Sequence, residues 1–208
     1  MKYLNTKLTI GQCVKDFIKS KDSVILVLTQ DCEIIIRDLA QEIFMEYYGV
    51  NHNPIIGLGF DPNPKSRYKI IMVDNPNDIH TLISLYKNCG RKIFAITACL
   101  IENQIADIEK QCEAQIPLFY QQNNLECWLS WAEAKEIHPL IRRFIKENGV
   151  SMVSGLTNNN LYTTRSWQSM STTLYNWDKY GIDDVDLDFK VNNLPQEFKE
   201  CCLSHYKK

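Results

Sequence analysis

The sequence predicts an α/β fold, with a mostly parallel sheet and helices on both faces, followed by a smaller helical part. Three largely apolar runs of strand length predict the sheet, since such runs are typical of strands buried on both faces. They are Ser23–Leu28, Tyr68–Val73 and Lys92–Ala98. Helical periodicity lies between and after these runs, which gives the strand–helix–strand order of parallel sheets with right-handed crossovers.

Length and composition agree with a globular chain. The 208 residues are 45% hydrophobic and 23% charged, enough for a sizeable core. With 23 basic and 25 acidic residues the net charge is −2, which argues against non-specific nucleic-acid binding. No apolar run approaches the roughly 20 residues that span a bilayer, and the first residues lack the pattern of a secretory signal. We therefore expect no membrane segment and a cytoplasmic location.

The first part of the chain predicts three helices, one before the first strand and two between strands. Residues 10–20 carry apolar side chains on one face, and a second helix is expected between an N-cap at Asp31 and an end at Gly49. Residues 51–67 are rich in proline and glycine and predict a loop around at most one short strand. A third helix is expected over 78–89.

The second part shows helical patterns and no convincing strand. Helices are expected over 101–112, 125–136, 139–148 and 166–180, with an exposed Asn-rich loop at 155–163. We therefore expect three regions: an α/β core, a helical part and an acidic, loosely attached tail that holds Asp183, Asp184, Asp186 and Asp188. Their expected bounds are residues 1–120, 121–181 and 182–208.

The eight cysteines do not predict a disulfide framework, which is typical of short secreted chains. The nearest pattern to a metal site is Cys201, Cys202 and His205, whereas structural zinc usually needs four ligands in two pairs. Thiols in a reducing cytosol are the favoured interpretation, and no metal is expected.

Two segments carry a resemblance to a known family. Cys127–Asn148 reads CWLSWAEAKEIHPLIRRFIKEN, and Thr163–Leu174 reads TTRSWQSMSTTL. Together they resemble the lid of MoxR-like AAA+ ATPases, which carry W-L-x-W-A…I-H-P…F-L and then P-R-S-W-E-x-x-S. Here Thr164 and Gln168 replace the proline and the glutamate. The resemblance implies a P-loop-NTPase-like sheet with a small helical lid, ATP and Mg²⁺ as cofactors, and assembly into an oligomer. From the residues alone, the tryptophans of these segments are more often core packing than chemistry.

The phosphate loop of that family is missing. A P-loop needs glycines whose backbone N–H groups wrap the phosphates, and a lysine followed by Ser or Thr. The first strand instead runs into TQDCE, residues Thr29–Glu33, with no glycine and no lysine. Two carboxylates at a helix start oppose a triphosphate there. The segment predicts an ordinary strand-to-helix turn.

The other nucleotide-site positions of the family are kept only in part. Asp74, after the second strand, matches the Mg²⁺-binding acid, although a turn-forming role is the favoured alternative. Asn75 follows it and cannot act as the general base. Cys99 stands near the position of the polar sensor, where Thr97 is the nearest hydroxyl.

Three arginines of the helical part are further candidates for functional residues. Arg165 matches the arginine that the family points at the γ-phosphate, and a surface or interface salt bridge is its alternative. Asp74, Thr97 and Arg165 are therefore remnant nucleotide-site positions. Arg142 and Arg143 are candidate interface arginines, with a solvated helix face as the alternative.

No other catalytic pattern is present. His138 precedes Pro139 at a helix start, which favours a structural cap over a general base. The sequence holds no G-x-S-x-G, H-E-x-x-H or G-x-G-x-x-G motif.

These observations favour a catalytically inactive AAA+-like subunit that acts as an interaction or assembly module. Its partner would be a protein, such as an active AAA+ ATPase subunit, and it would need no cofactor. Two alternatives stay open: a weak MoxR-like ATPase that binds ATP and Mg²⁺ through Asp74 and Arg165, and a stand-alone α/β binding protein. Fold class alone does not separate them.

Overall fold

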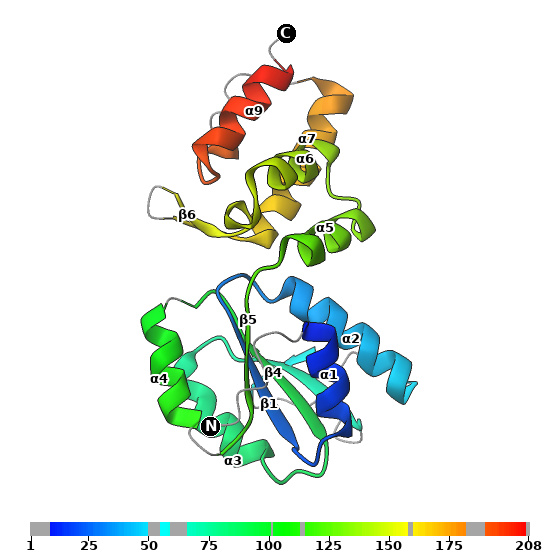
Figure 1. Ribbon diagram of the computed structural model, residues 1–208, viewed down its shortest axis with the longest axis vertical. Helices are drawn as coiled ribbons and strands as arrows, with labels where there is room; N and C mark the ends of the chain where they lie inside the picture. The colour runs from blue at the N-terminus through cyan, green and yellow to red at the C-terminus, as the bar shows by residue number, and fades with distance from the viewer. Residues whose placement is uncertain are drawn as a thin grey trace. The chain divides into compact units, whose positions relative to one another are not determined.

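The computed structural model describes residues 9–49, 55–58, 66–100, 102–112, 115–157, 160–181 and 190–206. The chain divides into two compact units, residues 1–122 and residues 123–208. We call them the α/β unit and the helical unit, and describe each by itself (Figure 1). None of the helices in the described ranges is long and apolar enough to cross a membrane.

The α/β unit is built on a five-stranded sheet of order β2-β3-β4-β1-β5, in which every neighbouring pair is parallel. This confirms the predicted α/β class with a parallel sheet. β1 lies in the interior, where Val27 is level with Ile96 of β4 and Phe119 of β5. The strands are β1 (Val24–Thr29), β2 (Ile55–Gly57), β3 (Tyr68–Met72), β4 (Lys92–Thr97) and β5 (Leu118–Gln121).

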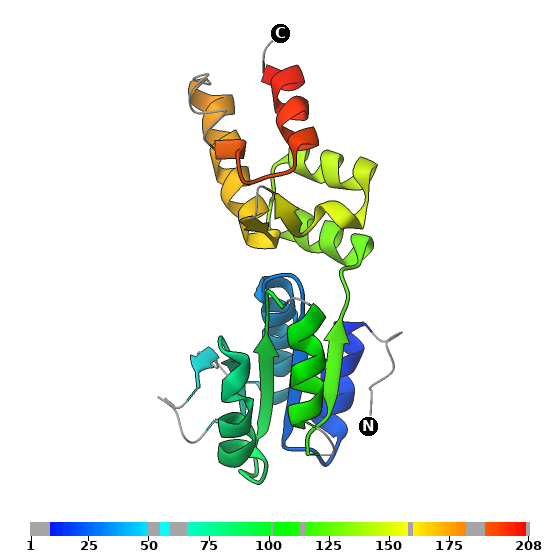
Figure 2. The same ribbon diagram turned by 90° about the vertical axis from the view of Figure 1, so that its left-hand side faces the viewer.

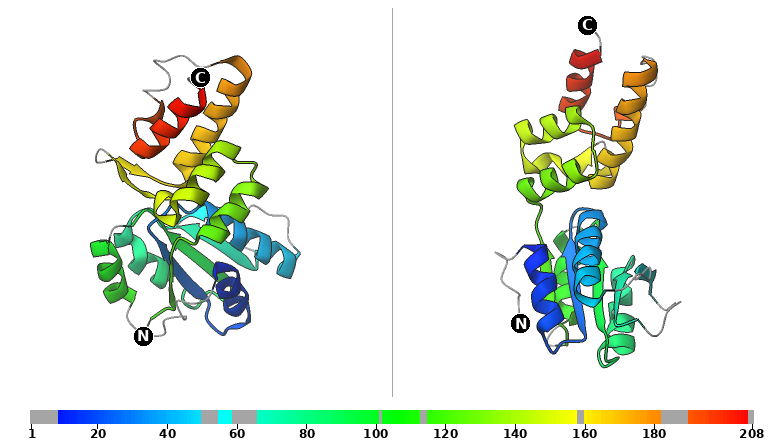
Figure 3. Two further views of the ribbon diagram at one scale, coloured as in Figure 1. Left: turned by 45° about the horizontal axis from the view of Figure 1, so that its top comes forward. Right: turned by 90° about the vertical axis from the view of Figure 1, so that its right-hand side faces the viewer.

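Helices cover both faces of this sheet, as the sequence predicted. α1 and α2 pack on one face, and α3 and α4 on the other (Figures 2 and 3). Strand side chains alternate between the two cores: Val27 faces α1 and α2, whereas Leu26 and Leu28 face α3 and α4. The helices are α1 (Ile10–Lys19), α2 (Ile34–Tyr48), α3 (Ile79–Tyr86, after the 3₁₀ turn Pro76–Asp78) and α4 (Glu102–Cys112).

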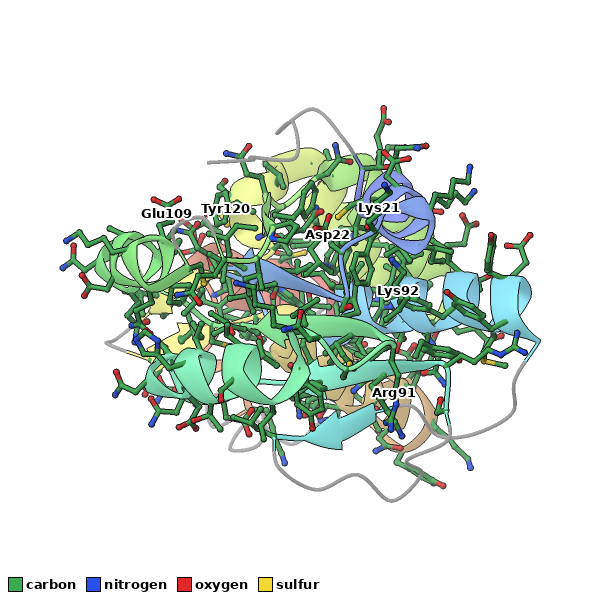
Figure 4. All side chains as sticks on the ribbon, turned by 90° about the horizontal axis from the view of Figure 1, so that it is seen from below. Lys21, Asp22, Arg91, Lys92, Glu109 and Tyr120 are labelled. Carbon is green, nitrogen blue, oxygen red and sulfur yellow. The ribbon has the colours of Figure 1, made fainter. Side chains whose placement is uncertain are left out.

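Aromatic rings and one lysine pack on the sheet face that α1 and α2 cover. Phe44 of α2 is fully buried and stacks on Tyr68 with a centroid distance of 4.6 Å. At the amino end of the strands, Lys92 donates to the carbonyl oxygens of Ser20 and Asp22, both at 2.7 Å, and lies over the ring of Phe17 (Figure 4). Burial lowers the pKa of Lys92. The ammonium therefore ties the α1–β1 turn to β4 and has a structural role.

The helical unit has a core of its own, rich in tryptophan. Trp128 and Trp167 are fully buried, and the Trp167 indole N–H donates to the carbonyls of Met152 and Val153, both at 3.0 Å. The preference for packing over chemistry at these tryptophans is confirmed. The elements are α5 (Leu125–Ala134), α6 (Pro139–Asn148), the 3₁₀ turn Val150–Met152, β6 (Gly155–Thr157), β7 (Asn160–Tyr162), α7 (Thr164–Tyr180) and α9 (Gln196–Tyr206).

Three sequence-based expectations differ from the structure. Strand β5 of the α/β unit lies after residue 101, where no strand was expected. The Asn-rich loop 155–163 contains the β6–β7 hairpin. The predicted loose tail is wrong for residues 190–206, because Phe198 of α9 is fully buried against Phe144 and Trp167, at centroid distances of 5.1 and 4.9 Å. The four clustered aspartates, Asp183, Asp184, Asp186 and Asp188, lie outside the described residues.

Candidate functional site

The candidate site of the α/β unit is the carboxyl end of β1 and β4. The chain leaves β1 through α2 toward β2 at one edge, and it leaves β4 through α4 toward β5 at the other. Neighbouring strands whose connections run in opposite directions form a topological switch point, where open α/β sheets bind their ligands. Here the switch point consists of residues 29–33 and 97–100 (Figure 1).

Backbone hydrogen bonds join the two segments of the switch point. The N–H of Cys99 donates to the carbonyl of Asp31 at 2.9 Å, and the N–H of Leu100 donates to the carbonyl of Thr29 at 3.1 Å. These N–H groups and carbonyls are thus satisfied within the protein. They are not available to surround a ligand unless the two segments separate.

The turn between β1 and α2 also uses its own polar side chains. The Thr29 hydroxyl accepts from the Asp31 N–H at 3.1 Å, and the buried Asp31 carboxyl accepts from the Cys32 N–H at 2.7 Å. The expectation that Asp31 caps the helix is wrong, because α2 begins after Glu33, which makes no side-chain cap bond. Two acidic side chains therefore stand beside the positive end of the α2 dipole, where an anion would otherwise be favoured.

Two features of the switch point could not be seen in the sequence. Cys99 has a φ of 56°, a left-handed conformation that costs energy for a residue with a Cβ. Thr97 is 1% exposed, and among the described residues its hydroxyl finds no hydrogen-bond partner. Strained backbone and unsatisfied polar atoms cluster at functional sites, so this end of β4 stays a candidate position for a ligand.

The structure places two of the three residues predicted as remnants of a nucleotide site at the carboxyl ends of neighbouring strands. Asp74 is exposed and follows Val73, whose N–H donates to the carbonyl of Ile96 at 2.9 Å. Asp74 and Thr97 thus both lie at the carboxyl edge of the sheet. Asn75 accepts from the Asn77 N–H at 3.0 Å and makes the turn that the sequence suggested. Arg165 belongs to the helical unit, where it is exposed in the first turn of α7.

At the start of α7, Thr164, which departs from the motif of the resembled family, forms a hydrogen bond to another helix. Thr163 and Ser166 form a capping box at the helix start. The hydroxyl of Thr164, at the position of the family's proline, accepts from the Trp128 indole N–H at 3.0 Å. A proline has no side-chain acceptor, so this bond between α5 and α7 depends on the substitution.

His138 caps helix α6, as predicted. Its Nδ1 accepts from the Leu140 N–H at 3.2 Å, which leaves the proton on Nε2, 2.8 Å from the Asp178 carboxylate. Asp178 also accepts from the Tyr206 hydroxyl at 2.8 Å. The hydrogen bond from His138, followed by that from Tyr206, lowers the pKa of Asp178. Both ring nitrogens are used structurally, so this His–Asp pair is not arranged as a general base.

The cysteines do not converge on a metal site. Within the described ranges, no group of three or more His, Cys, Asp or Glu side chains could hold a metal ion, and this includes the Cys201, Cys202 and His205 pattern. Burial raises the pKa of Cys202 and of Cys13 to about 12, and that of Cys112 to about 11. These three are buried thiols of the two cores.

Comparison with known proteins adds little to this description. No protein-family model matches the sequence, and no curated protein sequence is similar to it. Among solved structures, a DNA polymerase III gamma subunit-related protein from Thermotoga maritima aligns with a TM-score of 0.46 and 10% identity. The alignment covers 93% of this chain and 69% of that chain. At this distance the likeness assigns neither a family nor a function.

Proposed function

We propose that this chain is a catalytically inactive AAA+-like subunit of the MoxR-like kind, which serves as an interaction or assembly module and does not bind or hydrolyse ATP. The observation that carries the proposal is the bonding of the switch point. The N–H groups of Asp31 and Cys32, in the β1–α2 turn where a phosphate loop would lie, are held by the Thr29 hydroxyl and the Asp31 carboxyl. In a nucleotide-binding chain of this kind, phosphates would need free donors at this place.

Charge and side-chain chemistry support the same conclusion. The β1–α2 turn has no glycine and no lysine, and Asp31 and Glu33 stand at the start of α2. Asn75 in place of a carboxylate leaves no general base beside Asp74. Asp74, Thr97 and Arg165 are in this proposal remnants of a nucleotide site, and no cofactor is required.

The surface of the helical unit supports a protein partner. Leu156 and Leu161 are paired across the β6–β7 hairpin and are 71% and 44% exposed. Exposed Tyr175 and Tyr180 lie on α7. Large apolar side chains left in water are common at protein interfaces, and tyrosine is enriched there.

Calorimetric titration with ATP and Mg²⁺ tests the proposal. We expect no saturable heat up to about 1 mM nucleotide, since a site that binds at that level would need about 4 kcal/mol of interaction. ATP turnover should equal that of a buffer control. Micromolar binding that disappears in Asp74→Ala would contradict the proposal and support a weak ATPase with an aberrant phosphate loop.

A further inference from the structure

A hollow in the helical unit lies between the α5–α6 turn and the exposed face of α7. Its volume is about 670 Å³, within the usual range of ligand pockets. Glu136 and Arg142 line one side of it, and Gln168, Thr172 and Tyr175 of α7 line the other. All of these residues belong to one compact unit, so its walls are set by that unit's own packing.

The turn that forms one wall is fixed by hydrogen bonds. The N–H of Ile137 donates to the carbonyl of Ala132 at 2.8 Å, and the N–H of Glu136 donates to the carbonyl of Glu133 at 3.0 Å. This pair of bonds is a Schellman motif. The Tyr175 hydroxyl donates to the Glu136 carbonyl at 3.1 Å and joins the turn to α7. The hollow is therefore preformed.

Arg142 lines this wall and has a buried donor that finds no acceptor among the described residues. Its Nε–H is buried and has no acceptor. Its Nη1 lies 3.9 Å from the carboxylate of Glu133, beyond hydrogen-bond distance, and that side chain is 79% exposed. A guanidinium has five N–H donors, and a buried donor without an acceptor is unfavourable. An acceptor that enters the hollow would relieve this cost.

We propose that the hollow binds the carboxylate of an acidic side chain on a protein partner, with Arg142 as its charged contact. A carboxylate presents two acceptor oxygens at the spacing of a guanidinium edge, and such forked pairs are the strong ones. In the proposed complex, the Arg142 side chain reorients so that Nε–H and one Nη–H reach the same carboxylate. The Gln168 amide lies on the opposite wall as a further donor.

The rim of the hollow has no net positive charge that would favour a polyvalent anion. Glu133 and Glu136 line it together with Lys135 and Arg142, so its charges balance. A doubly charged phosphate would meet two carboxylates there, whereas a single carboxylate on a neutral segment adds one charge. The binding of a carboxylate is argued from Arg142 alone. That this carboxylate belongs to a protein partner rests on the proposed function.

Nuclear magnetic resonance of the ¹⁵N-labelled full chain tests the site directly. The probe is glutamate with both termini capped, titrated while the arginine Nε–Hε signals are followed, and capped glutamine is the neutral control. We expect a saturable shift of the Arg142 signal with a Kd of roughly millimolar, and none with capped glutamine. Arg142→Lys should weaken binding about tenfold, because an ammonium cannot form the fork.

Arg143, the exposed neighbour on α6, is the matched control. Equal shifts of Arg142 and Arg143, or no saturable shift of Arg142, would overturn the site. A pull-down tests whether the carboxylate belongs to a protein partner. Recovery of co-purifying protein should fall in Arg142→Lys and not in Arg143→Lys. Equal recovery in the two variants would contradict the proposal of an acidic protein partner. ATP binding by the chain would refute the proposed function without touching the Arg142 titration, so the two failures are distinguishable.

Discussion

At the scale of single residues, the helical unit places its polar side chains in structural bonds. His138 caps α6 with one ring nitrogen and holds Asp178 of α7 with the other, and Asp178 in turn accepts from Tyr206 of α9. Three helices that are separate in the sequence are thus joined through one carboxylate. A His–Asp pair is common in catalytic sites, but His138 and Asp178 here link helices of the helical unit.

This cross-link predicts a pH dependence of stability. Hydrogen bonds hold the pKa of Asp178 below its usual value, so the carboxylate stabilises the fold above that value and its contribution is lost as the pH falls through the folded pKa. Because the side chain is 46% exposed, we expect Asp178→Asn to cost only about 0.5–1 kcal/mol near pH 7. The cost should shrink toward zero as the pH falls below the folded pKa of Asp178.

Urea unfolding followed by tryptophan fluorescence, for wild type and variant at each pH, measures this difference. Glu200→Gln is the matched acid-to-amide control: Glu200 is exposed on α9, and its replacement leaves Asp178 and its two hydrogen bonds in place. A difference between wild type and Asp178→Asn that stays constant from neutral to acid pH would contradict the ionic role of Asp178.

Arg165 carries a second prediction at this scale. It is exposed in the first turn of α7, whose buried face holds Trp167, Met170 and Leu174. If it docks a partner, Arg165→Ala should change the free energy of unfolding by less than about 0.5 kcal/mol. It should weaken association by about 2 kcal/mol or more, as arginine hot spots do.

Thermal melts beside pull-downs check both values, with exposed Lys179→Ala of the same helix as the control. Lost stability with unchanged partner recovery would leave Arg165 a structural residue.

The residues of the switch point mark the limit of prediction from sequence. Local patterns located Asp74 and Thr97 at strand ends, since apolar runs end there. They could not show the bonds that join Thr29 and Asp31 to the segment after β4, because these partners are far apart in the chain. The left-handed backbone of Cys99 was also hidden, since glycine is the usual signal for that conformation.

At the scale of elements, the strands that the sequence predicted are those buried on both faces. β1, β3 and β4 are interior strands and appear in the sequence as largely apolar runs. β5 lies at an edge, and only Leu118 and Phe119 of its four residues are buried, so its pattern is too short to recognise. Helix α9 was missed because only Phe198 and Cys202 carry its buried face.

The turn between α5 and α6 predicts a stabilising substitution. Glu136 occupies the left-handed position of a Schellman motif with a φ of 53°, where glycine is usual. Glu136→Gly should therefore stabilise the helical unit by roughly 0.5–1 kcal/mol. Urea midpoints from tryptophan fluorescence measure the gain. Glu136→Ala is the matched control, because it removes the carboxylate and keeps the Cβ. An equal gain in both variants would assign the effect to charge and not to backbone strain.

At the scale of the whole molecule, the two units have separate cores and different spectroscopic probes. All four tryptophans, Trp128, Trp131, Trp167 and Trp177, are buried in the helical unit. The core of the α/β unit is instead built on Phe44, Phe94 and Tyr68. Tryptophan emission therefore reports the unfolding of one unit, whereas far-UV circular dichroism reports both.

This separation predicts that the units unfold independently. Phe44→Ala removes a fully buried ring that stacks on Tyr68 and should destabilise the α/β unit by about 3–5 kcal/mol. The circular dichroism transition in urea should then split, while the tryptophan transition keeps its midpoint, because units with their own cores can fold alone.

Phe198→Ala is the reciprocal control: its ring is fully buried against Phe144 and Trp167, so the tryptophan midpoint should fall. If Phe44→Ala lowers the tryptophan midpoint as much as the circular dichroism midpoint, the two units unfold as one cooperative body, and a partner bound by the helical unit would then stabilise the α/β unit as well.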